Sequence, residues 1–202
     1  MEKIDNDSLS IRTYKSLKNL ILAKEIAGKI NQEEIAKNLG VSRTPVIYAL
    51  NRLNSEGFLE VIPYKGFFIK KYEVKEFLEI LEARLLFELY GIEKLINNLS
   101  EKDIKILKNF IRRFKNYYKN NDIGKYRSLD INFHNYIIKN TNNRYIIKEY
   151  RDYIMIPIIS SGFIPPDISI KQHENLVESI ISKDLKKSKE IIEEHIKALI
   201  LK

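Results

Sequence analysis

Apolar residues recur at the spacing of amphipathic helices along most of the chain, and this pattern changes once, near residue 72. Before that point the helical segments are short, and they are followed by two β segments around the turn Pro63-Tyr64-Lys65-Gly66. The pattern predicts helices at 11–27, 32–38 and 42–55, and strands at 58–62 and 67–71.

Residues typical of helix ends support these boundaries. Asn31 is a good N-cap for the second helix, with Glu34 three positions later as in a capping box. Gly40 suits the left-handed position after that helix, and Pro45 is tolerated in the first turn of the next one. These signals predict two helices joined by a tight glycine turn.

The pattern after residue 74 is helical throughout. It predicts about six amphipathic helices, at 74–98, 101–119, 123–139, 143–159, 169–182 and 185–201. We therefore expect a mainly α protein with two domains. Residues 1–72 would form a small α+β domain, a winged helix-turn-helix, and residues 73–202 an all-α helical bundle.

Composition excludes several classes of protein. The chain has 202 residues, of which 44% are hydrophobic, and its net charge of +8 permits a polyanionic partner. It lacks cysteine, which excludes disulfides and thiolate sites. No apolar run is long enough for a membrane span, and the first residues lack the apolar core of a signal peptide. We expect a soluble cytoplasmic protein with no membrane partner.

The predicted order of helix, glycine turn, helix and β-hairpin is that of a winged helix-turn-helix. In such a unit the second helix enters the major groove of DNA, and its early residues meet bases and phosphates. Here these residues are Ser42, Arg43 and Thr44, while Lys65 lies at the tip of the hairpin. Hydroxyl groups and arginine can bind phosphate, and arginine can also read guanine.

The residues of this segment resemble the winged-helix domain of GntR-family transcriptional regulators. The resemblance rests on Gln32-Glu33-Glu34-Ile35-Ala36, Leu39-Gly40-Val41-Ser42-Arg43-Thr44-Pro45-Val46, Ala49-Leu50, Arg52-Leu53, Glu56-Gly57-Phe58-Leu59, Pro63, Lys65-Gly66 and Phe68-Ile69. It implies a double-stranded DNA operator as partner, contacted by Ser42, Arg43, Thr44, Lys65 and Gly66. A winged helix retained as a protein-interaction module is the alternative.

Three positions depart from the family's pattern. Ile47 and Tyr48 stand where the family usually has arginine and glutamate, and Glu33 stands where it has arginine. Since these positions are associated with DNA contact, we expect DNA binding with altered specificity.

All three histidines of the chain fall on apolar helix faces of the predicted bundle. Asp130 and His134 are four residues apart and so project from one face, while His173 and His195 lie on two later helices. Several buried polar groups each need a partner. A divalent transition ion such as zinc, nickel or manganese would satisfy all four, and a hydrogen-bonded core network is the alternative.

The same arrangement resembles the metal-binding FCD ligand domain that follows the winged helix in the FadR subfamily of GntR regulators. Arg84 and Glu88 match that domain's arginine-x-x-x-glutamate pattern. The resemblance implies that Asp130, His134, His173 and His195 are metal ligands and that Arg84 faces an effector pocket. Guanidinium geometry suits an effector carboxylate, although Arg84 could instead pair only with Glu88.

The expected function is therefore a ligand-responsive transcriptional regulator, a repressor that acts as a homodimer on its operator. Its effector would be a small molecule, an organic acid. Two alternatives remain at this point: a regulator for which the metal ion itself is the signal, and a metal-dependent hydrolase.

Overall fold

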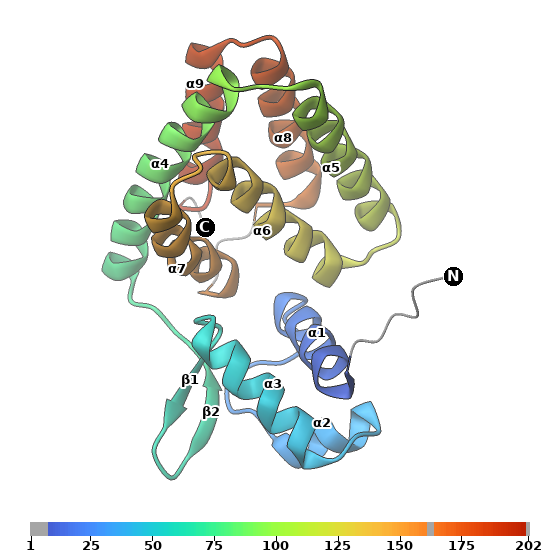
Figure 1. Cartoon of the computed structure of the whole chain (residues 1–202). Coiled ribbons are helices and arrows are strands. Elements are labelled where there is room, and N and C mark those ends of the chain that lie inside the picture. Colours follow the sequence, from blue (N-terminus) through green and yellow to red (C-terminus); the bar gives the residue numbers. More distant parts are fainter. Residues whose placement is uncertain (1–7, 161–163, 201–202) are drawn as a thin grey trace. The chain divides into compact units, whose positions relative to one another are not determined.

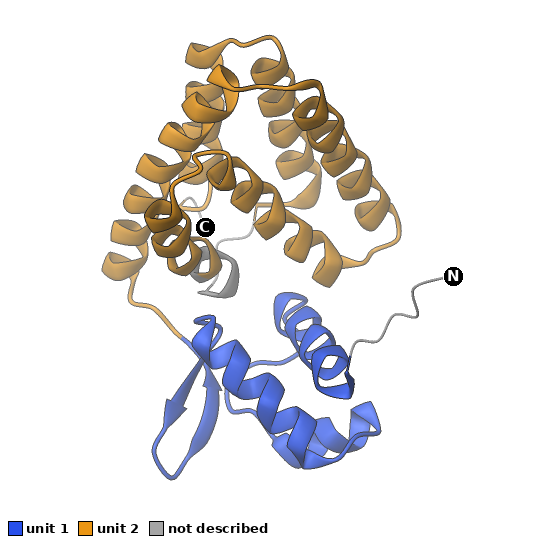
Figure 2. Cartoon of the chain, in the orientation of Figure 1, with its two compact units in different colours: residues 1–70 blue, residues 71–202 orange. Residues whose placement is uncertain are grey.

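The computed structural model describes residues 8–160 and 164–200 of the chain. The chain divides into two compact units, residues 1–70 and 71–202, shown in Figure 2. We had expected the boundary after residue 72, and the structure places it two residues earlier.

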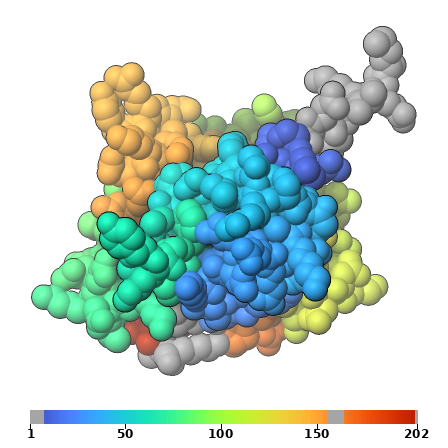
Figure 3. Space-filling model, turned by 90° about the horizontal axis from the view of Figure 1, so that it is seen from below, coloured from blue at the N-terminus to red at the C-terminus, as the bar shows by residue number. Residues whose placement is uncertain are grey.

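Unit 1 is a winged helix-turn-helix (Figure 1). Strands β1 and β2 form an antiparallel hairpin, the wing, whose turn includes Tyr64 and Gly66 with positive φ angles of 62° and 98°. Figure 3 views the face of this unit on which α3 (cyan) and the wing (teal) are exposed. The elements are α1 (Leu9–Leu22), α2 (Gln32–Leu39), α3 (Arg43–Ser55), β1 (Leu59–Ile62) and β2 (Gly66–Ile69).

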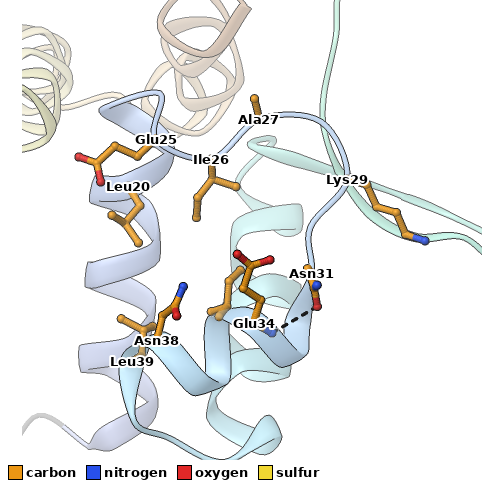
Figure 4. Close-up of a pocket in the computed structure, with 10 residues that line it drawn as sticks. Leu20, Glu25, Ile26, Ala27, Lys29, Asn31, Glu34, Asn38 and Leu39 are labelled. Atoms are coloured by element: carbon orange, nitrogen blue, oxygen red, sulfur yellow. Dashed lines mark hydrogen bonds between the residues drawn. The ribbon is translucent and has the colours of Figure 1, made fainter.

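The expected caps of the helix-turn-helix are present. The Asn31 side chain accepts hydrogen bonds from the backbone N–H groups of Glu33 and Glu34, and Figure 4 shows the second of these. Gly40 ends α2 with a φ of 63°, a conformation that glycine adopts without strain. The same close-up shows an open pocket of about 330 Å³ between the end of α1 and α2, with Leu20 and Ile26 among its lining residues.

The first helix is shorter than its apolar pattern predicted. We expected it to run over residues 11–27, but α1 begins at Leu9 and ends at Leu22. The following residues turn away because Lys24 and Gly28 have positive φ angles. Their backbone then bonds to the wing, where Ile69 N–H donates to the Gly28 carbonyl. The wing thus satisfies backbone groups that a longer helix would have satisfied internally.

A polar cluster at one end of the core joins α1 to α3. The Tyr14 hydroxyl donates to Glu56, with Oε1 and Oε2 at 2.8 and 2.7 Å, and Lys18 donates to Glu56 at 2.9 Å. The guanidinium of Arg52 lies 4.0 Å from the centre of the Tyr14 ring and donates to Glu56. This cluster fixes the helix on which the predicted DNA-contact residues lie.

Unit 2 is all-helical in the part that the structure describes, as expected. The longest helix, α4, packs against α6, α7, α8 and α9, while α5 packs against α6 and α8. The helices are α4 (Val74–Asn97), α5 (Glu101–Lys119), α6 (Ile123–Lys139), α7 (Arg144–Ser160), α8 (Pro166–Ile181) and α9 (Leu185–Lys197). Helix α8 begins three residues before its predicted start, because Pro166 is well placed in a first turn.

One glycine of α4 permits a close approach to α6. A Cβ added at Gly91 would lie 3.0 Å from Ile138 Cδ1 and 3.1 Å from Ile137 Cγ2. This contact brings the C-terminal part of α4 against the end of α6, about one turn from the polar residues Glu88 and His134 described below. No helix among the described residues is long and apolar enough to cross a membrane.

Candidate metal centre and DNA-contact surface

Three helices of unit 2 bring the four predicted ligands into one buried cluster. Helix α6 carries Asp130 and His134, α8 carries His173, and α9 carries His195. Each offers one donor atom, and the four atoms lie within 4.8 Å of one another. All four residues are buried, with His134 and His173 fully so. The structure therefore gathers side chains that come from widely separated segments of the sequence.

The distances within the cluster suit a small divalent ion. The Nε2 atoms of His134 and His173 are 3.3 Å apart, and Asp130 Oδ1 lies 3.4 and 3.9 Å from His173 Nε2 and His134 Nε2. Bonds of about 2.0–2.1 Å to zinc place adjacent ligand atoms about 3 to 3.4 Å apart. The donor atoms of these three residues thus fit one ion with little movement.

Two further side chains hold the imidazole rings in orientation. Glu88 Oε2 lies 2.6 Å from His134 Nδ1, and Gln172 Oε1 lies 2.8 Å from His195 Nδ1. An acceptor at Nδ1 favours the tautomer whose Nε2 lone pair is free. Such partners are typical of histidines that bind metals, since they fix both the ring and its tautomer.

Burial also keeps two of the rings neutral. It is the main cause that lowers the pKa of His173 and of His195 well below the ordinary value, and the charges of His134 and Arg84 lower both further. Burial raises the pKa of Asp130. A metal ion binds imidazole in its neutral form and a carboxyl group in its ionised form. The two rings are therefore ready to bind a cation, and a bound cation would favour the ionised form of Asp130.

Glu88 is the centre of a second buried network next to the cluster. It accepts hydrogen bonds at 2.6 Å from Arg84 Nε and from the Tyr150 hydroxyl. Burial by itself raises the pKa of Glu88, but the charges of His134 and Arg84 outweigh it, so the pKa lies well below its usual range. Glu88 was expected only as a partner of Arg84, and sequence reasoning missed Tyr150 and Gln172 altogether.

Arg84 is buried with part of its guanidinium unpaired. Its side chain is 2% exposed, and Nη2 has no hydrogen-bond partner within the described residues, although Nε is bound to Glu88. His173 Nδ1 is in the same condition. Because a buried unpaired donor costs free energy, the unpaired Nη2 of Arg84 suggests an absent acceptor.

Unit 1 brings most of the predicted DNA-contact residues to one surface. Ser42 is the N-cap of α3, and Arg43 and Thr44 begin the helix, all three exposed. Arg43 lines one open cleft of about 390 Å³ together with Lys65 and Gly66 of the wing. Ser42 and Thr44 lie beside this cleft on the same helix end and do not line it.

Two charged residues of this cleft modify the expected picture. Glu33 of α2 forms an ion pair with Arg43, with 3.4 Å between the charged atoms, and both side chains are largely exposed. Lys29, which sequence reasoning did not single out, also lines the cleft because its backbone pairs with Phe68 of the wing. No local pattern predicts that pairing.

The comparisons with known proteins agree with this arrangement. Residues 9–69 match the family described as bacterial regulatory proteins, gntR family, and residues 79–198 match the FCD domain. The chain belongs to the GntR family of transcriptional regulators, in its FadR/FCD-type subfamily. It is a DNA-binding transcriptional regulator and not an enzyme, which removes the hydrolase alternative.

Individual relatives support the same class. The Nta operon transcriptional regulator of Aminobacter aminovorans is 31% identical over 61% of this chain and 58% of its own length. The HTH-type transcriptional regulator YdhC of Bacillus subtilis is 24% identical over 93% of this chain and 86% of its own length. Among solved structures, E. coli McbR/YncC has the same fold, with a TM-score of 0.72 at 20% identity over 95% of this chain and 94% of that one.

Proposed function

We propose that this regulator is a repressor whose affinity for its operator is controlled by an organic acid bound at a metal site in unit 2. The observation that carries the proposal is the unpaired Nη2 of buried Arg84 in the same helical core as the cluster of Asp130, His134, His173 and His195. Two relatives are named repressors, of a gluconate operon and of a D-xylose utilization operon, which supports the direction of control. Binding of chromosomal DNA would place the chain in the cytoplasm.

In this proposal the four residues hold a divalent transition ion, with zinc, nickel and manganese as the candidates. Three imidazoles and one carboxylate leave coordination positions open for a ligand oxygen. The unpaired guanidinium nitrogen would bind the effector carboxylate, for which arginine has suitable geometry. The effector would change operator affinity only if it binds one arrangement of the protein more tightly than another.

Elemental analysis of tag-free protein tests the metal site first. We expect about one transition-metal ion per chain, and its loss in Asp130→Asn and His173→Ala. Asp152→Asn is the matched control, because Asp152 is an exposed carboxylate outside the cluster. Circular dichroism should show that each variant is folded. If chains loaded with zinc, nickel or manganese retain no ion after gel filtration, the cluster is a hydrogen-bonded core network.

A carboxylate screen tests the effector site. Metal-loaded protein should be stabilised by one or more small organic acids, and the stabilisation should be lost in Arg84→Lys, which keeps the charge but not the planar fork. Operator binding should change when that acid is added. If operator affinity instead follows metal concentration and no acid alters it, the ion is the signal.

We also propose that the regulator is a homodimer. Helix α4 exposes three large apolar side chains along one row, Leu78, Leu86 and Tyr90, with exposed fractions of 40, 68 and 39%. Exposed Glu82 interrupts this row. Large exposed apolar side chains at helical spacing favour an interface. Light scattering should give a dimer for the native chain, and Leu86→Glu should weaken it, whereas the exposed Tyr118→Glu on α5 should not.

A further inference from the structure

The exposed face of α3 is uncharged along most of its length. Four of its exposed residues, Thr44, Ile47, Tyr48 and Asn51, follow the spacing i, i+3, i+4 and i+7, so they form one stripe on the helix. Ile47 is 40% exposed and Tyr48 47% exposed, although α3 has a buried apolar face elsewhere. We call these four residues the α3 stripe.

The chemistry of the α3 stripe does not fit phosphate. The four residues carry no cation. The cations of this surface lie around them, with Arg43 at the start of α3 and Lys29 and Lys65 at the cleft. Arg52 follows the stripe at i+8, where its guanidinium is held by Glu56 and the Tyr14 ring. Arg43 is moreover paired with Glu33, which draws its guanidinium towards α2. The cations therefore suit the DNA backbone, and the stripe is left for the edges of the bases.

Base edges of A·T pairs match the stripe in two respects. In the major groove, thymine presents a C5-methyl group that apolar side chains can contact. Adenine presents N7 and an N6 amino group, which asparagine binds with two hydrogen bonds. Ile47 and Tyr48 supply the apolar surface, and Asn51 lies one turn further along the same face. The bidentate contact with guanine uses arginine or lysine, and the stripe holds neither. Arg52, next along the same face, is engaged by Glu56.

We propose that the α3 stripe reads A·T pairs in the operator, with Ile47 and Tyr48 against thymine methyl groups and Asn51 on adenine. These residues thereby determine the specificity of the half-site under α3. The inference rests on the DNA binding of the family and is independent of the metal and effector proposed for unit 2.

The test begins with the full-length chain and a randomised DNA duplex library at low salt. We expect the selected half-sites to hold consecutive A·T pairs at the positions beneath α3. The best duplex is then remade with deoxyuridine for single thymines, which removes the methyl group and keeps the base pair. Each contacted methyl should contribute about fourfold to affinity, from the usual free energy of burying one such group.

Variants assign the contacts to particular side chains. Ile47→Ala and Tyr48→Ala should each weaken binding to the duplex that contains thymine. Each should also abolish the loss of affinity that deoxyuridine causes at one position. Asn51→Ala should weaken binding at least about fivefold and relax the choice of adenine at one position. Ile168→Ala and Tyr118→Ala are matched controls, because these unit 2 residues are exposed to 49 and 46%. They should leave affinity and the deoxyuridine effect unchanged.

Several outcomes would overturn the inference. Enrichment of G·C pairs beneath α3, or of no sequence at all, would exclude A·T reading by the stripe. Equal affinity for the thymine and deoxyuridine duplexes would exclude methyl contacts. If deoxyuridine still lowers the affinity of Ile47→Ala and Tyr48→Ala, other residues contact the methyl groups. Unit 2 variants that no longer respond to the effector should still give these DNA-binding results. The proposal for the α3 stripe and the proposal for the metal and effector site can therefore fail independently.

Discussion

Replacing Glu88 with glutamine should destabilise unit 2 strongly, because this carboxylate is the counter-charge of buried Arg84. Glu88 is fully buried and lies at 2.6 Å from Arg84 Nε, from the Tyr150 hydroxyl and from His134 Nδ1. The variant keeps the shape of the side chain but leaves a positive charge in the core with a weaker partner. Removal of one member of a buried ion pair costs about 3–5 kcal/mol.

The assay is urea and thermal unfolding followed by circular dichroism, on native protein and the variant after chelation of any metal. At about 3 °C per kcal/mol for a unit of this size, the melting temperature should fall by roughly 10–15 °C. Glu93→Gln is the matched control, since Glu93 pairs with Lys189 at the surface at 2.7 Å. Such exposed pairs contribute about 0–1 kcal/mol.

A double variant separates the charge from the packing. Glu88→Gln with Arg84→Met removes both charges, so much of the lost stability should return. If Glu88→Gln unfolds no earlier than Glu93→Gln, the ionic network in the core does not stabilise unit 2. If the double variant is as unstable as the single one, packing rather than charge explains the loss.

Three further predictions concern other sites. Burial by itself raises the pKa of Glu56, but Lys18, Tyr14 and Arg52 together outweigh it, so the pKa is lowered overall. Ionised Glu56 therefore stabilises unit 1 above its unfolded pKa of about 4.5, and this contribution is lost as pH falls through the folded pKa. Glu56→Gln should cost about 1–2 kcal/mol at pH 7 in urea titrations, and this cost should shrink as the pH is lowered below 4.5. Gly91→Val should cost about 1–3 kcal/mol by crowding α6, measured by thermal melting of the full chain; an unchanged melting temperature would contradict the close approach of the two helices. Glu33→Gln should strengthen binding to a random DNA duplex, measured by fluorescence anisotropy, and steepen the salt dependence of that binding, because Arg43 loses its competing carboxylate. Unchanged affinity would show that the ion pair does not restrain Arg43.

The glycine and capping residues show why the fold could be predicted from the sequence. Asn31 and Gly40 act through bonds to residues within one turn, so their roles are visible in the local pattern. The six helices of unit 2 were predicted for the same reason, since apolar periodicity is a property of each segment. The error in α1 arose where this rule fails, because the backbone around Gly28 bonds to the distant wing.

Sequence alone determined which residues face the core, including Asp130 and the histidines, because helical spacing fixes the face of each helix. Whether those faces converge depends on how the helices cross, and only the tertiary structure decided that four donor atoms lie within 4.8 Å. It likewise decided that Gln172 orients His195 and that Glu33 pairs with Arg43. These contacts join separate elements of the fold, so no local pattern in the sequence encodes them.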